Sequence, residues 1–539
     1  MCGIFAFLGK GVSKETLKEH CDKIQHRGPD ITQYKDVTDE VFFGFHRLAI
    51  NGLDHGSDQP FEIDGKVLIC NGEIYNFKEL GEQFGFEYQT HSDCEVIIHL
   101  YKHFNGDMTQ VCQHLDGVFA FGLYDSEKDT VFVARDHLGI RPLYIGRTDD
   151  GEIALASEAK SLTFCSQYSQ FPPRCWWCLT DPDLYNSYYR FEFDQLPAEE
   201  CEEGMICNSI RELFTEAVRK RFIMADVEVG CLLSGGLDSS LVTAICAGLT
   251  EDPSTLKTFS IGMSGSPDLE AAQKVADFLG TDHYSVELSE QEFLDAIENT
   301  VYALGSFDIT TIRASVGHKL VSQWVRDHTN VKVLFSGEVA DECSGSYAYF
   351  CNAPSPEEFQ KESIWLMREI HLYDGLRSDR SISSAGLESR VPFSDKDFLA
   401  YYMRIPPEMK MFDTQKIEKY LLRKAFDGIL PDSVLWRKKN GFSDGCSNVS
   451  RSWSVIVQEM VDQAVSDEEY ESERLRYTEK IRPNLKEGYY YMKLFEQWYG
   501  PYDEYAGTWE SLTPYQWLPK WCGDVVDPSA RVLSCYAAD

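Results

Sequence analysis

Cysteine at position 2 lies one residue from the start of the chain, where removal of Met1 would leave a thiol on the N-terminal residue. A free α-amino group has a pKa of about 7.7 to 8.0 and a cysteine thiol about 8.5, so the amine can take the thiol proton near neutral pH. Such a residue is a nucleophile with its own base, and it needs no histidine. Small residues are common after the start methionine, so the position of Cys2 alone does not establish a catalytic role.

Polar motifs suited to binding an amino acid follow within the first hundred residues. They are His26–Asp30 (HRGPD), Phe45–Ile50 (FHRLAI), Asn71–Asn76 (NGEIYN) and Ser92–Glu95 (SDCE). Arg47 can bind a carboxylate through two hydrogen bonds, and Glu73 and Asp93 can bind an ammonium group. The Asn71 side chain and the Gly72 N–H can form an oxyanion hole. These residue types indicate hydrolysis of a glutamine side chain by a thiol.

A glycine-rich turn follows the apolar run Val227–Leu233, which we predict to be a buried strand. Exposed backbone N–H groups at the start of a helix bind phosphate, and glycines allow close approach. The turn lacks the terminal lysine of a Walker A loop and resembles the pyrophosphate loop of enzymes that split ATP into AMP and pyrophosphate. We therefore expect ATP to contact Ser234, Gly235, Gly236, Leu237, Asp238, Ser239 and Ser240.

Three carboxylates, Glu338, Asp341 and Glu342, follow a second predicted strand at Val331–Phe335. Neighbouring carboxylates are unfavourable unless a cation or an ammonium group pairs with them. Mg²⁺ prefers oxygen ligands and can neutralise a polyphosphate, so it is one cation that could pair with these carboxylates. The cations available for acidic substrates are Arg313, Arg390 and Lys439.

The length and the charge of the chain restrict its number of domains and the kinds of partner that it can bind. A chain of 539 residues suggests about two to four domains. Its 51 basic and 87 acidic side chains give a net charge of -36, which repels nucleic acids and anionic membranes. Seventeen cysteines without a signal peptide indicate reduced thiols in the cytosol. There is no apolar stretch of 18 residues, and no organic prosthetic group is indicated.

One cysteine pattern has alternative interpretations. Cys175 and Cys178 form a CxxC, followed by Cys201 and Cys207. Such a motif can be a redox pair or half of a zinc site. The second pair has the wrong spacing for zinc, so we favour packed thiols beside two tryptophans.

The first 160 residues have the short alternating runs of a sheet-rich domain. Strands are predicted at Phe42–Ile50, Val67–Cys70, Val118–Tyr124, Thr130–Ala134 and Ile153–Ser157, with a helix at Cys94–Lys102. The periodicity is lost from Phe164 to Glu203, which we interpret as a connector over a domain interface.

Strands then alternate with helices, which is typical of a doubly wound parallel sheet. Ser209 and Glu212 form a capping box and predict a helix start. Further elements are expected as a helix ending at Ala247, a strand at Thr258–Gly262, a helix at Pro267–Leu279 and a strand at His283–Leu288. Beyond about Ser355 the pattern is mainly helical.

From Met1 to about Phe495 the chain resembles the glutamine-hydrolysing asparagine synthetases. MCGIF, HRGPD, NGEIYN, LLSGGLDSS, SPDLEAA, TTIRAS, SGExxDE, RVPF and FSDG occur in the order typical of that family. Each motif alone is weak to moderate evidence, whereas the ordered set is highly specific. The resemblance implies a sandwich-type glutaminase at residues 2–190, an α/β ATP-pyrophosphatase domain at 205–515 and a tail at 516–539.

The same resemblance implies glutamine, aspartate and Mg-ATP as ligands, a β-aspartyl-AMP intermediate, an internal ammonia tunnel and commonly a homodimer. It makes Cys2 the nucleophile, Glu338 a residue needed to form the adenylate, and Lys439 and Arg313 contacts to aspartate or phosphate. Glutamine contacts correspond to Arg47, Leu48, Ala49, Ile50, Asn51, Asn71, Gly72, Glu73 and Asp93. Nucleotide contacts correspond to Leu232, Ile261, Ser336 and Gly337. The resemblance also implies a magnesium site at Asp238, Asp341 and Glu342.

The chain departs from the family pattern in four places. Val339 and Ala340 stand where the family usually has glycine and serine, and Val339 adds a branched side chain to a position of free backbone geometry. Ser346 replaces a usual glycine and Ser394 a usual leucine, and Asn440 with Gly441 replaces an acidic and a larger residue. We expect synthesis to persist with altered loop geometry.

Other enzymes and one binding role are the alternatives. A related amidating enzyme would use a different acid acceptor, but β-lactam synthetases have lost the glutaminase function that the Cys2 set indicates. Phosphoribosyl-transferring and glucosamine-forming amidotransferases should lack SGGLDSS. A non-catalytic descendant would bind ligands without releasing AMP.

Overall fold

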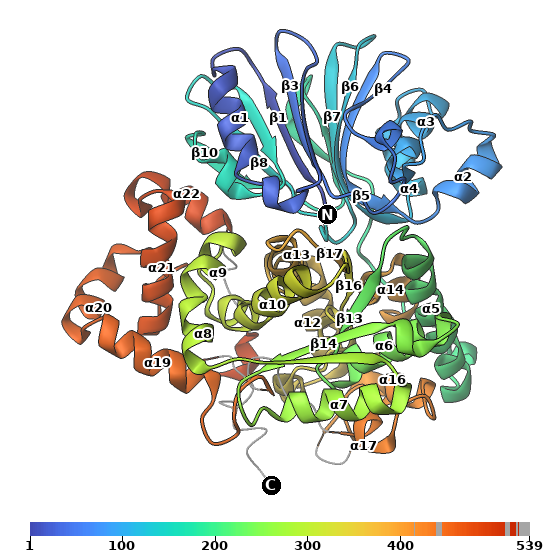
Figure 1. The fold of residues 1–539 in the computed structure, drawn as a ribbon, viewed down its shortest axis with the longest axis vertical. Coiled ribbons are helices and arrows are strands. Elements are labelled where there is room, and N and C mark those ends of the chain that lie inside the picture. Colours follow the sequence, from blue (N-terminus) through green and yellow to red (C-terminus); the bar gives the residue numbers. More distant parts are fainter. Residues whose placement is uncertain (414–415, 438–444, 513–517, 524–526, 528–539) are drawn as a thin grey trace.

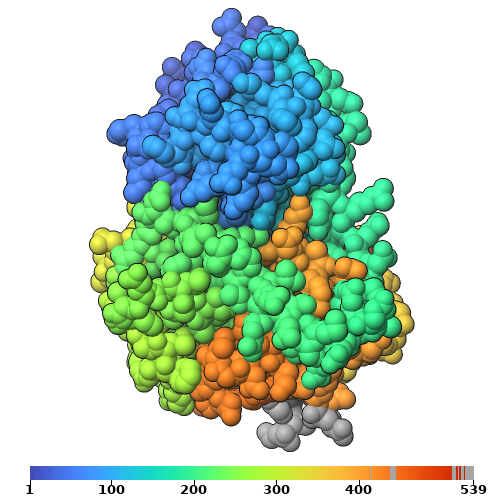
Figure 2. All heavy atoms as spheres, turned by 90° about the vertical axis from the view of Figure 1, so that its right-hand side faces the viewer, coloured from blue at the N-terminus to red at the C-terminus, as the bar shows by residue number. Residues whose placement is uncertain are grey.

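The computed structural model describes residues 1–413, 416–437, 445–512, 518–523 and Asp527. Most of the tail predicted at 516–539 lies outside the described residues. Two regions stand one above the other in Figure 1, and Figure 2 shows them in contact across the breadth of the molecule. The upper region, here called the sandwich, contains the first twelve strands (Gly3–Ser187). The lower one, here called the parallel-sheet region, extends from Glu203 to Leu512.

The sandwich consists of two six-stranded sheets packed face to face. The first has the order β10 (Gln167–Gln170), β8 (Tyr144–Arg147), β9 (Ile153–Ala156), β1 (Gly3–Leu8), β3 (Val41–Arg47) and β2 (Ile31–Asp36). The second has the order β12 (Asp181–Ser187), β11 (Cys175–Cys178), β7 (Thr130–Arg135), β6 (Gly117–Asp125), β5 (Lys66–Ile74) and β4 (Phe61–Ile63). Alternating apolar residues of both sheets, such as Ile4, Phe43, Ile69 and Val133, fill the space between them.

Helices cover the outer faces of the sandwich, which completes a four-layer αββα fold. Helix α1 (Lys14–Asp22) packs on the first sheet, where its Leu17 and Cys21 meet Phe5 and Phe42. Helices α2 (Phe77–Phe84), α3 (Val96–His103) and α4 (Met108–His114) cover the second sheet. The fold class predicted for this half is therefore confirmed.

The predicted connector at 164–203 is wrong for residues 167–187, because they form β10, β11 and β12. These strands complete one edge of each sheet, and Trp177 is fully buried between the sheets. In an extended strand, Cα atoms three residues apart are separated by about 10 Å, which is too far for a disulfide. Cys175 and Cys178 are therefore not a redox pair, and each is a free thiol.

The parallel-sheet region is a five-stranded sheet with helices on both faces (Figure 1). Its order is β15 (Asp282–Glu287), β14 (Lys257–Gly262), β13 (Val229–Leu232), β16 (Val333–Phe335) and β17 (Glu388–Arg390), all parallel. Chain order reverses at β13, so the loops after β13 and β16 meet at a topological switch point. The predicted doubly wound sheet is confirmed.

The first helices of this region are α5 (Glu203–Ile223), α6 (Leu237–Leu249), α7 (Pro267–Leu279), α8 (Glu290–Asp295), α9 (Ile297–Leu304), α10 (Ile309–His328) and α11 (Ala340–Ser344). The later ones are α12 (Pro356–Glu369), α13 (Asp374–Ser383), α14 (Lys396–Tyr402), α15 (Pro407–Lys410), α16 (Tyr420–Ala425), α17 (Asp432–Leu435), α19 (Trp453–Ala464), α20 (Asp467–Glu473), α21 (Lys486–Tyr499) and α22 (Tyr502–Leu512). Among the described residues, none of these helices combines the length and apolar character needed to cross a bilayer.

The capping box predicted at Ser209 is wrong. Helix α5 starts at Glu203, so Ser209 lies in its second turn. Ile206 and Cys207 are buried against the core, and their packing extends the helix upstream of the local capping signal.

Candidate functional site

Cys2 directly precedes β1, and the N-terminus lies at the junction of the sandwich and the parallel-sheet region (Figure 1). Its thiol is half-buried with Sγ 3.9 Å from the carbonyl oxygen of Leu48, and burial raises the pKa of the thiol. Met1 is buried, and its amino group is 3.5 Å from a carboxylate oxygen of Glu388. While Met1 is present, the Cys2 nitrogen is a peptide nitrogen, so the predicted internal base requires Met1 removal.

Asn71 and Gly72 lie side by side on β5. The Asn71 side chain is completely buried, and among the described residues neither its amide nitrogen nor its oxygen has a hydrogen-bond partner. Buried amides are nearly always hydrogen-bonded. A Cβ at Gly72 would lie 2.8 Å from the Val118 carbonyl oxygen, so the close pairing of β5 with β6 requires glycine. An unused amide beside a glycine N–H is suited to a transient oxyanion.

The predicted ammonium site contains two buried carboxylates. Asn51 donates to Glu73 at 2.5 Å, and the N–H of Ile74 donates to Asp93 at 2.6 Å. Burial raises the pKa of Glu73 well above its ordinary value and that of Asp93 to about 6. Burial disfavours the charge of both carboxylates, of Glu73 even with Arg390 3.2 Å away, so the pair is suited to an ammonium ligand.

Arg47 ends β3 and holds the loop that follows it. Its guanidinium donates to the Asp54 carbonyl at 2.9 Å and also to the carboxylate of Asp58 and the carbonyl of Gly52. A substrate carboxylate would have to share or replace these partners, and the predicted contact remains a prediction. Leu48 and Ile50 are buried beside it, and the N–H of Ala49 donates to Asp30 at 2.8 Å.

The predicted phosphate loop connects β13 to α6. Gly235 has φ +72°, and a Cβ there would lie 2.4 Å from the Ala271 backbone, so only glycine fits. The N–H of Ser234 donates to the Ser239 hydroxyl at 3.2 Å, which closes the turn. The Ser240 hydroxyl is buried and has no hydrogen-bond partner among the described residues. The backbone conformation is that of an anion-binding turn.

The loop at 336–342, here called the carboxylate loop, packs against the phosphate loop. A Cβ at Gly337 would lie 2.6 Å from the Ser239 nitrogen, so glycine allows the two loops to touch. Ser336 lies at the end of β16, and Leu232 and Ile261 lie on the neighbouring strands β13 and β14. The structure thus places the predicted nucleotide residues together at the carboxyl ends of the strands.

Lys419 is a site residue that the sequence analysis missed. Its ammonium nitrogen is 2.5 Å from both Asp238 and Asp341, two of the three predicted magnesium ligands. These carboxylates raise the pKa of Lys419 despite its burial. Lys419 has φ +58°, an uncommon conformation for lysine that could not be foreseen from its surrounding residues. A cation therefore lies between the phosphate loop and the carboxylate loop.

Glu338 faces helices α10 and α13. Its carboxylate pairs with Arg377 and lies 3.5 Å from His318 Nε2, and burial raises the pKa of Glu338 to about 7. Glu342, the third predicted magnesium ligand, accepts a hydrogen bond from Tyr347. Burial and nearby Asp374 raise the pKa of Glu342 well above its ordinary value. Several acidic groups thus share few cations, which is suited to a cationic ligand.

Two residues that depart from the family pattern affect the geometry of the carboxylate loop. Val339 has φ +75° and ψ -13°, which is a rare conformation for a β-branched residue but an ordinary one for glycine. The backbone therefore keeps a glycine-like turn although valine occupies it. Ser346 donates to Asp341 Oδ1 at 2.6 Å, a contact that glycine cannot make. Ser346 therefore helps to hold the Asp341 carboxylate in place.

Both arginines predicted to bind aspartate have other partners. Arg313 lies on α10 and binds Glu487 of α21, with Nε 2.8 Å from Oε1, and also Asp527 at 3.0 Å. Arg390 binds Glu388 at 2.8 Å and reaches Glu73 of the sandwich at 3.2 Å. These buried ion pairs do not support the aspartate assignment, and Arg390 belongs to the junction near Cys2. Lys439, Asn440 and Gly441 lie outside the described residues.

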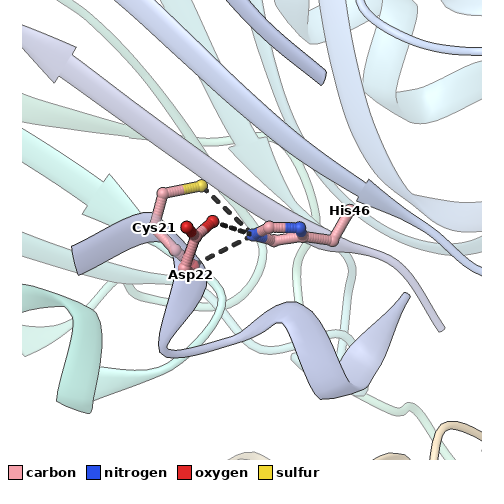
Figure 3. A group of neighbouring side chains, drawn as sticks. All are labelled: Cys21, Asp22 and His46. Atoms are coloured by element: carbon pink, nitrogen blue, oxygen red, sulfur yellow. Dashed lines mark hydrogen bonds and ion pairs between the residues drawn. The ribbon is translucent and has the colours of Figure 1, made fainter. Parts of the chain in front are cut away.

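Cys21, Asp22 and His46 form a separate group at the end of α1 (Figure 3). The Nε2 atom of His46 is 3.0 Å from the carbonyl oxygen of Cys21 and 3.3 Å from the Sγ atom of Cys21. The Nδ1 atom of His46 is 2.8 Å from the Thr32 hydroxyl. One ring nitrogen can donate to the carbonyl while the other accepts from the hydroxyl, so both are satisfied. We assign this group a structural role in ending the helix.

The fold and these centres define a class of two-part proteins, in which an αββα sandwich with a thiol at its start precedes a parallel sheet that carries an anion-binding turn at its switch point. The glutamine amidotransferase domain family matches residues 1–173, and the asparagine synthase family matches residues 209–358 and 351–499. Glutamine-hydrolysing asparagine synthetases of Gallus gallus and Homo sapiens are 42% and 41% identical to this chain, and each alignment covers 99% of both proteins.

The chain therefore belongs to the glutamine-hydrolysing asparagine synthetase family.

Proposed function

We propose that the protein makes asparagine, AMP and pyrophosphate from aspartate, ATP and the amide nitrogen of glutamine. The observation that carries the first half-reaction is the buried amide of Asn71, which has no hydrogen-bond partner in the part of the chain that the structure describes. It lies beside Gly72 and close in the sandwich to the carboxylates Glu73 and Asp93. In this proposal Cys2 attacks the glutamine amide, and Asn71 and Gly72 stabilise the oxyanion. The C–N bond of the intermediate then breaks, which releases ammonia and leaves a thioester, and water hydrolyses the thioester to glutamate and the free thiol.

The second half-reaction is proposed for the switch point of the parallel sheet. The backbone of the phosphate loop would hold the pyrophosphate portion of ATP, and Glu338 would support formation of β-aspartyl-AMP. Asp238, Asp341 and Glu342 would hold Mg²⁺, whose preferred ligands are oxygen atoms. Asp238 and Asp341 already lie on either side of the ammonium group of Lys419. Bound Mg²⁺ would neutralise charge on the phosphates. Ammonia from the first centre would pass inside the molecule to the adenylate.

The same proposal includes the bounds of the domains, the location in the cell and the oligomeric state. The glutaminase unit would span 2–190, the synthetase unit 205–515 and the tail 516–539. A cytosolic location is supported by the free thiols of the described residues, and a homodimer by the family resemblance alone.

One incubation tests the proposal. Purified protein is mixed with ATP, Mg²⁺, aspartate and glutamine, and AMP, pyrophosphate, glutamate and asparagine are measured together. We expect asparagine and AMP in equal amounts. Glutamate without AMP would show a glutaminase that has lost the synthetase reaction, and binding without either product would support the non-catalytic alternative.

A further inference from the structure

Arg27 connects the nucleophile to the parallel-sheet region. Its Nε donates to the carbonyl oxygen of Cys2 at 3.1 Å, and its two Nη atoms donate to the two carboxylate oxygens of Asp379 at 2.8 and 3.1 Å. It also donates to Glu158 at 2.7 Å and to Ser383 at 3.0 Å. The backbone of Cys2 is therefore held by a fully buried side chain whose far end is bound to helix α13.

The same helix contacts the carboxylate loop. Arg377 of α13 pairs with Glu338 and is 2.9 Å from Asp374, and Asp374 accepts a hydrogen bond from Tyr347 at 2.8 Å. Arg377 and Asp379 are two residues apart, about 200° around the helix and about 3 Å along it, so they point to different sides. Figure 1 shows α13 just below the N-terminus. Helix α13 thus contacts the carboxylate loop directly and is connected to Cys2 through Arg27.

Buried charge makes this arrangement specific. Asp379 is also 3.0 Å from Arg380, and Glu158 is 2.8 Å from Lys160; all of these groups are almost completely buried. Removing one partner from a buried ion pair leaves an uncompensated charge, which is strongly unfavourable. The position of Arg27, and with it that of the Cys2 backbone, therefore depends on where α13 places Asp379. Small displacements of a reacting group reduce catalytic rates strongly.

We propose that Asp379 is a positioning residue for Cys2, acting through Arg27, and that α13 thereby makes glutamine hydrolysis responsive to the state of the carboxylate loop. The inference rests on the proposed glutaminase role of Cys2. When ligands bind at the carboxylate loop, a change in the Glu338–Arg377 pair shifts α13 and, with it, Asp379. Loss of the Asp379 charge should break this link without touching either set of reacting groups.

Asp379→Asn tests the inference in the full-length protein. We expect kcat for glutamine hydrolysis to fall about tenfold with KM within about twofold, because the nucleophile is displaced and the glutamine-binding groups are not. The change in glutaminase rate on adding ATP, Mg²⁺ and aspartate should disappear, whereas ammonia-dependent synthesis should stay within about twofold. Asp379→Glu should recover part of the loss, and Ser383→Ala, a milder variant, should lower kcat by about twofold.

Asp395→Asn is the matched control. Asp395 is equally buried, and its partners are Arg221 at 2.7 Å and Lys220 at 2.6 Å, both on α5 rather than α13. Lys220 also reaches Asp116 of the sandwich at 2.6 Å, so this variant too weakens a buried ion pair at the junction. Its ratio of glutamine-dependent to ammonia-dependent synthesis should equal that of the wild type.

Rates are normalised to the folded fraction from thermal unfolding. Equal ratios in the Asp379→Asn and Asp395→Asn variants would overturn the inference, as would ligand-dependent glutaminase activity that survives in Asp379→Asn. Absence of glutamine hydrolysis in the wild type would overturn the proposed function and the inference with it.

Discussion

The ammonium nitrogen of Lys419 lies 2.5 Å from a carboxylate oxygen of Asp341, and it is equally close to Asp238. Three segments that are far apart in the chain thus meet at one buried cation. Because two acidic loops approach each other here, a positive charge between them is required for their close contact.

Replacing Lys419 with methionine should disable the synthetase centre. Without the ammonium group, Asp238 and Asp341 repel each other, so we expect ammonia-dependent asparagine synthesis to fall by about 100-fold or more, with glutaminase activity within about twofold. Steady-state assays of both reactions check this outcome. Unchanged synthesis in Lys419→Met would contradict the proposed position of the cation site.

Cys2→Ala should separate the two reactions. We expect glutamine-dependent synthesis to fall at least about 1,000-fold, because the nucleophile is lost, whereas synthesis from added ammonia should be nearly unchanged. Cys175→Ala, which removes a half-buried thiol on strand β11 of the second sheet, serves as the control and should leave both rates intact. If Cys2→Ala lost glutamine-dependent and ammonia-dependent synthesis to the same extent, glutamine hydrolysis and asparagine synthesis would not be carried out by separate regions.

Asn71→Ala tests the oxyanion assignment. Loss of one donor that acts mainly in the transition state should lower kcat for glutamine hydrolysis by about 100- to 1,000-fold and leave KM within a few-fold. Because the Asn71 amide has no hydrogen-bond partner among the described residues, its removal should cost less stability than removal of a bonded amide. A large rise in KM with unchanged kcat would instead assign Asn71 to substrate binding.

Glutamine use should depend on pH through Asp93. Burial raises the pKa of this carboxyl to about 6, so it is protonated below that pH and ionised above it. An ionised carboxylate is needed to bind the ammonium of glutamine, so kcat/KM should fall as pH decreases through about 6. Synthesis from ammonia, measured at constant free NH3, should not show this inflection. A flat kcat/KM profile between pH 5 and 7 would remove Asp93 from the site.

Val339→Gly should be tolerated far better than other losses of a buried valine. Relief of the unfavourable φ of +75° offsets the lost apolar contacts, so we expect the free energy of unfolding to change by about 1 kcal/mol or less. Val333→Gly, in the buried strand β16, should lower it by about 3 kcal/mol or more. Denaturant unfolding measures both. Equal losses would show that the Val339 backbone is not strained.

The regular elements near the centres could be predicted because their signals are local. The helix at Pro267–Leu279 was predicted with its observed bounds, since Ser266 caps it and Gly280 ends it. The strands after 164 could not, because an edge strand such as β12 is largely exposed and lacks an alternating apolar pattern. The start of α5 was missed because distant core contacts extend the helix.

The sequence by itself determined the chemical groups of this protein: an N-terminal thiol, an amide beside a glycine, a phosphate-binding turn and a run of carboxylates, each encoded within a few adjacent residues. Only the tertiary structure decided their partners. Lys419 joins the acidic loops, while Arg313 and Arg390 bind carboxylates elsewhere, because charges buried in a folded core must pair with whatever the packing brings close. The pairs Lys419–Asp238, Arg313–Glu487 and Arg390–Glu73 each join residues more than a hundred positions apart, so no local pattern records them.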